Sequence, residues 1–122
     1  MDKRSISRIT VQQDLLLKDA LERLNETGFQ ILLVTDEESS LVGILNDGDV
    51  RRAVLENIEL DVPLSLIMNC EFTTLLESEA QKAEQLIENS QFNHLPIVDA
   101  QGKVVDLVIG GKGGADRFQT KD

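Results

Sequence analysis

Residues 20–48 read ALERLNETGFQILLVTDEESSLVGILNDG, and residues 83–111 repeat this pattern without a gap as AEQLIENSQFNHLPIVDAQGKVVDLVIGG. The two stretches are separated by a constant offset of 63 residues. Identical residues coincide in this register at Ala20 and Ala83, Phe29 and Phe92, Leu32 and Leu95, Asp36 and Asp99, and Gly48 and Gly111. Two halves built alike are expected to pack about a pseudo-twofold axis, so the repeat predicts two related units with a cleft between them.

The composition restricts the class of protein. The chain has 122 residues, of which 41% are hydrophobic and 28% are charged, as is typical of one soluble globular domain. Its 22 acidic and 12 basic residues give a net charge of −10, which repels nucleic acid and anionic membrane surfaces. No apolar run approaches the ~20 residues that a membrane span needs. We therefore expect neither nucleic acid nor a membrane as a partner, whereas a small anion can still bind where local donors favour it.

The few cysteine and histidine residues restrict location and chemistry. The single cysteine, Cys70, cannot form an internal disulfide, and no positively charged apolar leader opens the sequence, so we expect a cytoplasmic protein. One histidine cannot supply a catalytic constellation of nucleophile, base and orienting acid. One histidine and one cysteine in unrelated contexts do not form a metal site either. We therefore expect no enzymatic activity and no metal.

The first copy predicts a helix, two strands and a second helix. Apolar residues recur at helical spacing from residue 17 onward, and Gly28 provides a C-terminal stop. Residues 31–35 and 41–45 are short apolar runs on either side of a polar turn, as expected for two strands. Residues 47–57 predict the second helix. The buried face of that helix is expected to carry Val50, Ala53, Val54 and Ile58.

The second copy repeats this pattern only in part. Strands are expected over residues 72–75, 94–98 and 104–109. The helix between the first two of these strands is expected to carry Ala83, Leu86, Ile87 and Ser90 on its buried face. The glycine-rich run at residues 110–114 then stands where the first copy has its second helix, and it disfavours helix formation.

These patterns predict the organisation of the chain. A first repeat spans residues 1–60, and a linker with a short helical segment spans residues 61–71. A second repeat, truncated at its C-terminal helix, spans residues 72–110. Residues 111–122 are expected to form a flexible tail.

The sequence resembles a tandem pair of CBS domains, also called a Bateman module. The resemblance covers about residues 6–110 and is carried by LLVTD, LVGILNDGDVRRAVL, LIM, FNHLPIVD and KVVDLV. It implies an α/β (α+β) fold of two pseudo-twofold-related repeats, each a small sheet with flanking helices. Modules of this family are not enzymes. They bind adenine nucleotides between the repeats and regulate an attached enzyme, channel or transporter.

The resemblance also implies a ligand site. Nucleotide-binding members have a Ser or Thr three residues before an Asp after the second strand, and this sequence has Asn46 and Asp49 there. Asp49 matches the ribose-binding position, since a carboxylate accepts both hydrogens of a vicinal diol. His94 matches a position that faces the phosphates, and Arg51 and Arg52 could add positive charge at the rim. The implied regulatory ligand is AMP, ADP or ATP, and no cofactor is required.

Each of these residues also has a purely structural interpretation. Asn46 and Asp49 suit the capping of a helix N-terminus. His94 suits the start of a strand, and Arg52 suits the solvated face of a helix. The equivalent second site has Ile109 and Lys112 in register with Asn46 and Asp49, so at most one occupied site per chain is expected.

Two functions therefore remain open. The first is a regulatory module that senses an adenine nucleotide and controls an attached catalytic domain. The motifs DGDVRR and KVVDLV resemble those of CBS pairs attached to sugar-phosphate nucleotidyltransferases and sugar-phosphate isomerases. This resemblance favours a sugar-nucleotide enzyme as the parent protein. The second is a structural module that forms a homodimer through its helices and has degenerate, empty nucleotide sites.

Overall fold

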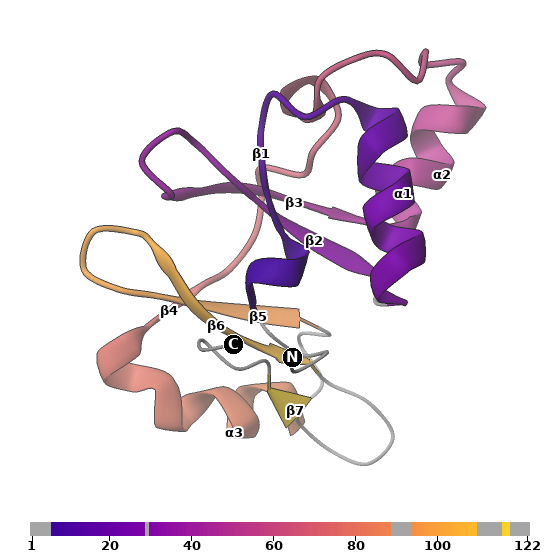
Figure 1. Ribbon diagram of the computed structural model, residues 1–122. Coiled ribbons are helices and arrows are strands. Elements are labelled where there is room, and N and C mark those ends of the chain that lie inside the picture. Colours follow the sequence, from indigo (N-terminus) through magenta and orange to yellow (C-terminus); the bar gives the residue numbers. More distant parts are fainter. Residues whose placement is uncertain (1–5, 29, 89–93, 110–115, 118–122) are drawn as a thin grey trace. The chain divides into compact units, whose positions relative to one another are not determined.

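The computed structural model describes residues 6–28, 30–88, 94–109 and 116–117. The chain divides into two compact units. We call Ile9–Phe72 the first unit, and Met1–Arg8 together with Thr73–Asp122 the second unit. Each unit contains one small sheet and helical segments, so the fold is mixed α and β, as the sequence predicts (Figure 1).

The sheet of the first unit has the strand order β1-β2-β3. β1 (Thr10–Gln12) runs parallel to β2 (Ile31–Thr35), and β3 (Leu41–Asn46) runs antiparallel to β2. All five residues of β2 are buried, as expected for a central strand that is covered on both faces. A short 3-10 helix, η1 (Ile6–Ile9), precedes β1.

The first helix, α1 (Leu17–Thr27), contacts β2. It ends at Gly28, whose φ of 74° lies in the left-handed region, so the predicted glycine stop is confirmed. Its N-terminus has no side-chain cap. Instead, the carbonyl oxygens of Leu60 and Val62 accept its first N–H groups at 2.9 and 2.8 Å. The backbone of residues 60–62 therefore caps the N-terminus of α1.

The second helix, α2 (Asp47–Leu55), contacts β3, and η2 (Leu64–Leu66) follows it. Its buried residues are Asp49 and Ala53. The prediction that Val54 lies on the buried face is wrong, because this side chain is 57% exposed. The helix has only nine residues, and its two buried residues lie about one turn apart on one narrow face. Val54 lies outside this face.

The second unit has the strand order β4-β5-β6-β7. β4 (Leu75–Leu76) runs parallel to β5 (His94–Val98), and β6 (Val104–Ile109) runs antiparallel to β5. β7 (Asp116–Arg117) runs antiparallel to β6. The predicted bounds of β5 and β6 are confirmed.

The helical part of the second unit begins with η3 (Glu77–Lys82), which the sequence did not predict, and continues into α3 (Ala83–Glu88). α3 contacts β5 and β6. Ala83 and Ile87 are buried on it, as predicted, and Ser90 lies outside the described residues.

Two expectations for this unit differ from the structure. The strand predicted over residues 72–75 forms only at Leu75–Leu76, because only these two leucines pair with β5. Phe and Thr in the preceding residues have a high strand propensity, but they have no partner strand in this ladder. Residues 111–122 were expected to be a flexible tail without regular structure, yet Asp116–Arg117 pairs with β6. The free edge of β6 offers N–H and C=O groups that a following segment can satisfy.

The repeat seen in the sequence extends to the hydrogen-bonded register. Leu32 pairs with Leu45 in the first unit, and Leu95 pairs with Val108 in the second, each 63 residues later. Both hairpins have a register irregularity at the equivalent place, between Val34 and Thr35 and between Ile97 and Val98. The parallel strands depart from this rule. Gln12 pairs with Thr35, whereas Leu75 pairs with Ile97, one residue short of the equivalent partner.

The turn of each hairpin is held by the repeated aspartate. Oδ1 of Asp36 accepts the N–H groups of Glu38 and Ser40 at 2.9 and 3.0 Å. Oδ1 of Asp99 accepts the N–H groups of Gln101 and Lys103 at the same distances. The aspartate after each strand is therefore a turn residue in both units.

The cores of the two units use equivalent positions. In the first unit Ala20, Leu32, Val34 and Leu45 are fully buried. In the second unit their counterparts are buried in one cluster, which also contains Ile87. These counterparts are Ala83, Leu95, Ile97 and Val108.

Candidate functional site

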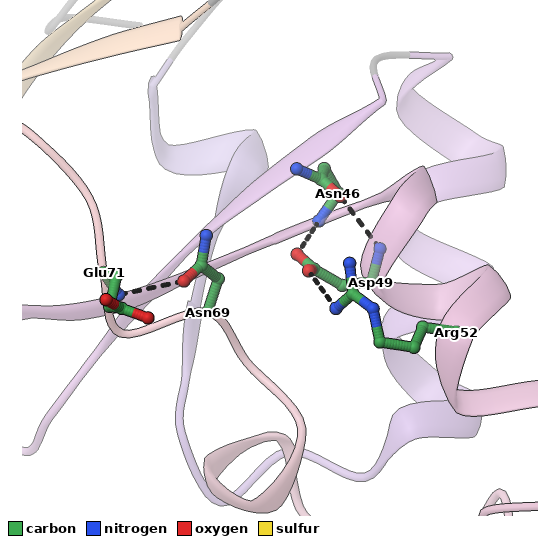
Figure 2. A network of polar contacts seen from close by, with 5 residues as sticks. All are labelled: Asn46, Asp49, Arg52, Asn69 and Glu71. Atoms are coloured by element: carbon green, nitrogen blue, oxygen red, sulfur yellow. Dashed lines mark hydrogen bonds and ion pairs between the residues drawn. The ribbon is translucent and has the colours of Figure 1, made fainter. Parts of the chain in front are cut away.

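The junction between β3 and α2 carries the predicted ligand motif, and it forms a capping box (Figure 2). Asn46 is the N-cap residue in an extended conformation, with φ −124° and ψ 178°. Its Oδ1 accepts the backbone N–H of Asp49 at 2.9 Å, and Oδ2 of Asp49 accepts the backbone N–H of Asn46 at 3.0 Å. Asn46 thus performs the capping role of a Ser or Thr at this position.

Asp49 is a nearly buried carboxylate, with an exposed fraction of 5%. Its second oxygen, Oδ1, accepts a hydrogen bond from Nη1 of Arg52 at 3.2 Å. The Arg52 side chain is 63% exposed, so one partner of this ion pair is buried and the other faces solvent. Figure 2 shows the Arg52 guanidinium directed at the carboxylate from the next turn of α2. The structural interpretation of Asn46 and Asp49 is confirmed, and their contact with a ligand stays a prediction.

A small pocket of about 140 Å³ lies beside this ion pair. Asp49, Arg52 and Glu56 provide its polar wall, and its other lining residues are Ala53, Ile58, Leu66 and Ile67. Pockets that enclose a whole drug-sized ligand measure roughly 300–1,000 Å³. The pocket of the first unit therefore has room for a part of a nucleotide the size of a sugar.

Sequence reasoning missed five of these lining residues, which are Ala53, Glu56, Ile58, Leu66 and Ile67. Leu66 and Ile67 lie in the segment expected to be a linker, and the only signal there was the apolar run LIM. The segment is held close to the sheet, because Asn69 exchanges two backbone hydrogen bonds with Ile44 of β3 at 2.8 and 3.0 Å. The Asn69 side chain accepts the N–H of Glu71 at 2.9 Å, which closes a short turn (Figure 2).

His94 is the first residue of β5 and pairs with Ile109 of β6. Burial lowers the pKa of His94 from its ordinary value, so the neutral imidazole is favoured near pH 7. His94 belongs to the second unit and Asp49 to the first. The expectation that both contact one ligand therefore stays a prediction.

The equivalent cross-strand pair, which we call a rung, has its polar residue on a different strand in each hairpin. Ile31 pairs with Asn46 in the first unit, and His94 pairs with Ile109 in the second. Each unit thus has one polar residue on this rung, on β3 in one case and on β5 in the other. Lys112, the counterpart of Asp49, lies outside the described residues.

The described part of the chain offers little else for chemistry. Within it, no group of three or more His, Cys, Asp or Glu residues could hold a metal ion. Cys70 is an exposed free thiol. None of the helices in the described ranges has the length and apolar character needed to cross a membrane.

Comparison with known proteins identifies relatives of this chain. The family model for the CBS domain matches residues 4–56. Arabinose 5-phosphate isomerase GutQ of Salmonella typhi is 32% identical over 91 residues, which are 74% of this chain and 28% of that protein. The chain thus spans little more than a quarter of this relative's length.

Solved structures share the fold. The CBS domain pair of protein MJ0100, in complex with 5-methylthioadenosine and S-adenosyl-L-methionine, has a TM-score of 0.69 at 24% identity. The match covers 83% of this chain and 80% of that one. CBSX2 in complex with AMP has a TM-score of 0.62 at 27% identity, covering 78% of this chain and 76% of that one.

Proposed function

Because the CBS domain model matches residues 4–56 and CBS domain pairs share the fold, we propose that this chain is a pair of CBS repeats and acts as a regulatory module that binds an adenine nucleotide and controls an attached enzyme. Regulatory binding, not catalysis, is the proposed role. The related CBSX2 binds AMP, and the proposed ligand here is AMP, ADP or ATP.

One observation carries the ligand assignment. Asp49 is a buried carboxylate that forms one wall of a pocket of about 140 Å³. A carboxylate has about four acceptor sites, of which two are used by Asn46 and Arg52. Because the carboxylate is only 5% exposed beside Arg52, we expect the hydroxyl groups of a ribose to reach it once the Arg52 side chain moves away. Asn46, Arg52 and His94 complete the proposed ligand-binding set.

The attached enzyme is proposed to act on a sugar phosphate or a sugar nucleotide. The support is the relationship to GutQ, an arabinose 5-phosphate isomerase whose length the chain covers only in part. A cytoplasmic location and the repeat boundaries at residues 60 and 72 belong to the same proposal.

The test measures how far the midpoint temperature of thermal unfolding shifts when AMP, ADP, ATP or GTP is added to the chain. A ligand present at about a hundred times its dissociation constant stabilises the native state by roughly 2.7 kcal/mol, a shift of several degrees at this size. Asp49→Ala should abolish the shift. Asp36→Ala is the matched control, because it also removes an aspartate that binds backbone N–H groups in the first unit, but from the hairpin turn. A full shift in Asp49→Ala would disprove the ribose assignment.

A second candidate function is structural homodimerisation through the helices. It is favoured by two consecutive large apolar side chains near the end of α2, where Val54 is 57% exposed and Leu55 is 76% exposed. Single exposed residues are common, but neighbouring ones mark interfaces. Sedimentation equilibrium should then show a concentration-dependent dimer that Leu55→Glu disrupts. A monomer at all concentrations would eliminate this function.

A further inference from the structure

We propose that Arg52 is a latch on Asp49, which the ligand must displace, and that this displacement makes the site select adenine ligands with an anionic group over uncharged or cationic ones. This inference rests on the proposed function, since it concerns the regulation and selectivity of the same site. It starts from the two hydrogen bonds that occupy the Asp49 carboxylate.

The two bonds differ in how easily they can be given up. The bond from the Asn46 N–H to Oδ2 belongs to the capping box, which holds the start of α2. Losing it would leave a helix N–H without a partner. The bond from Arg52 to Oδ1 comes from a long side chain that is 63% exposed and can reach water at once. Arg52 is therefore the partner that leaves when a diol approaches Asp49.

The guanidinium of Arg52 stays beside the pocket after it releases the Asp49 carboxylate. Arg52 lines the pocket together with Asp49, and it stands one helical turn after it on the same face of α2. A guanidinium carries five N–H donors, so it can bind a phosphate in a bidentate manner after it leaves Oδ1. A phosphate-bearing ligand thus replaces the ion pair that it breaks, whereas a nucleoside breaks the pair without replacing it.

The other charges of the pocket oppose an anion, so Arg52 is the one lining residue that attracts it. Glu56 also lines the pocket, so Asp49 and Glu56 contribute two negative charges against the single positive charge of Arg52. Without Arg52, a phosphate would face two carboxylates. The selectivity for an anion therefore depends on this one side chain.

The experiment compares the dissociation constants of AMP and adenosine by titration calorimetry for the unmodified chain, Arg52→Ala and Arg51→Ala. The unmodified chain should bind AMP at least about tenfold tighter than adenosine, which corresponds to about 1.4 kcal/mol. Arg52→Ala should reduce this ratio to about one or below, by weakening AMP while adenosine stays equal or tightens.

Arg51→Ala is the matched control, because it removes the same charge from an exposed position of α2 that is not among the residues lining the pocket. Its ratio should stay within about twofold of that of the unmodified chain. Arg52 is largely exposed, so its replacement should leave the fold intact, and a circular dichroism melt checks this.

The outcomes separate the latch from the proposed function. An unchanged ratio in Arg52→Ala, or an equal loss of AMP and adenosine binding, overturns the latch and leaves the adenine site standing. Equal binding of AMP and adenosine to the unmodified chain also overturns the latch and leaves the adenine site standing. Adenosine binding that appears only in Arg52→Ala supports the latch. If no adenine ligand binds to any of the three chains, both proposals fail.

Discussion

A single residue in each hairpin turn shows where the two repeats differ in backbone strain. Ser39 has a φ of 68°, in the left-handed region, and its counterpart 63 residues later is Gly102, with a φ of 84°. An L-residue in this region is destabilised by roughly 1–2 kcal/mol. Glycine adopts it without this penalty but loses roughly 0.5–1 kcal/mol through chain entropy.

Ser39→Gly is therefore expected to raise the free energy of unfolding by roughly 0.5–1 kcal/mol. The reciprocal change Gly102→Ala should lower it by about 1 kcal/mol, because a Cβ is introduced at a positive φ. Urea unfolding of the three chains measures both effects. A destabilised Ser39→Gly variant would show that the hydroxyl makes a contact worth more than the strain.

His94 should make the stability depend on pH. Burial lowers its pKa below the ordinary value of 6.5, so the unfolded chain binds the proton more tightly than the folded chain does. The free energy that His94 contributes is complete above pH 6.5 and falls as the pH decreases toward the folded pKa. His94→Gln should flatten the pH dependence between pH 7.5 and pH 5.5, a range above the ordinary titration of carboxylates at about pH 4. The same slope in both chains would mean that another group titrates.

At the scale of the elements, the segment after α2 determines much of the first unit. It caps α1 through the carbonyl groups of Leu60 and Val62, and it covers the edge of β3 through Asn69. It also brings Met68 against β3 at Gly43. A Cβ atom at residue 43 would lie 2.5 Å from Sδ and 2.7 Å from Cγ of Met68.

Gly43→Ala is accordingly expected to destabilise the chain by about 1–3 kcal/mol, because an overpacked site forces Met68 to move. Met68→Ala removes the atoms that clash, so it should recover part of this loss in the double variant. The unfolding free energies of the two single variants and the double variant form a cycle that isolates the contact. Strict additivity would show that the two residues do not meet.

At the scale of the whole molecule, the two units place equivalent leucines in their cores. Leu32 and Leu95 are both 0% exposed, so Leu32→Ala and Leu95→Ala should each lower the free energy of unfolding by about 2–5 kcal/mol. Leu55 is 76% exposed, and Leu55→Ala should change it by less than about 0.5 kcal/mol. Chemical denaturation measures all three. A small effect at only one of the two buried leucines would show that the repeats do not share a core design.

Particular elements show how far sequence reasoning reached. The bounds of β5 and β6 and the glycine stop of α1 were predicted correctly, since apolar periodicity and turn chemistry are visible in neighbouring residues. At the site, the sequence identified Asn46 and Asp49 together with both of their interpretations. It did not identify the pocket residues Leu66 and Ile67, because the fold brings them to α2 from a later segment of the chain.

The sequence by itself determined the repeat with its offset of 63 residues, the α+β composition and the Asp turns, because these features depend on local patterns that recur in register. Only the tertiary structure decided that β4 pairs one residue out of register and that β7 covers β6. It also decided that the Asp49 side chain is buried. The physical reason is that a strand edge is paired and a side chain is buried by whichever segment the folded chain brings to it, and local propensity does not encode that choice.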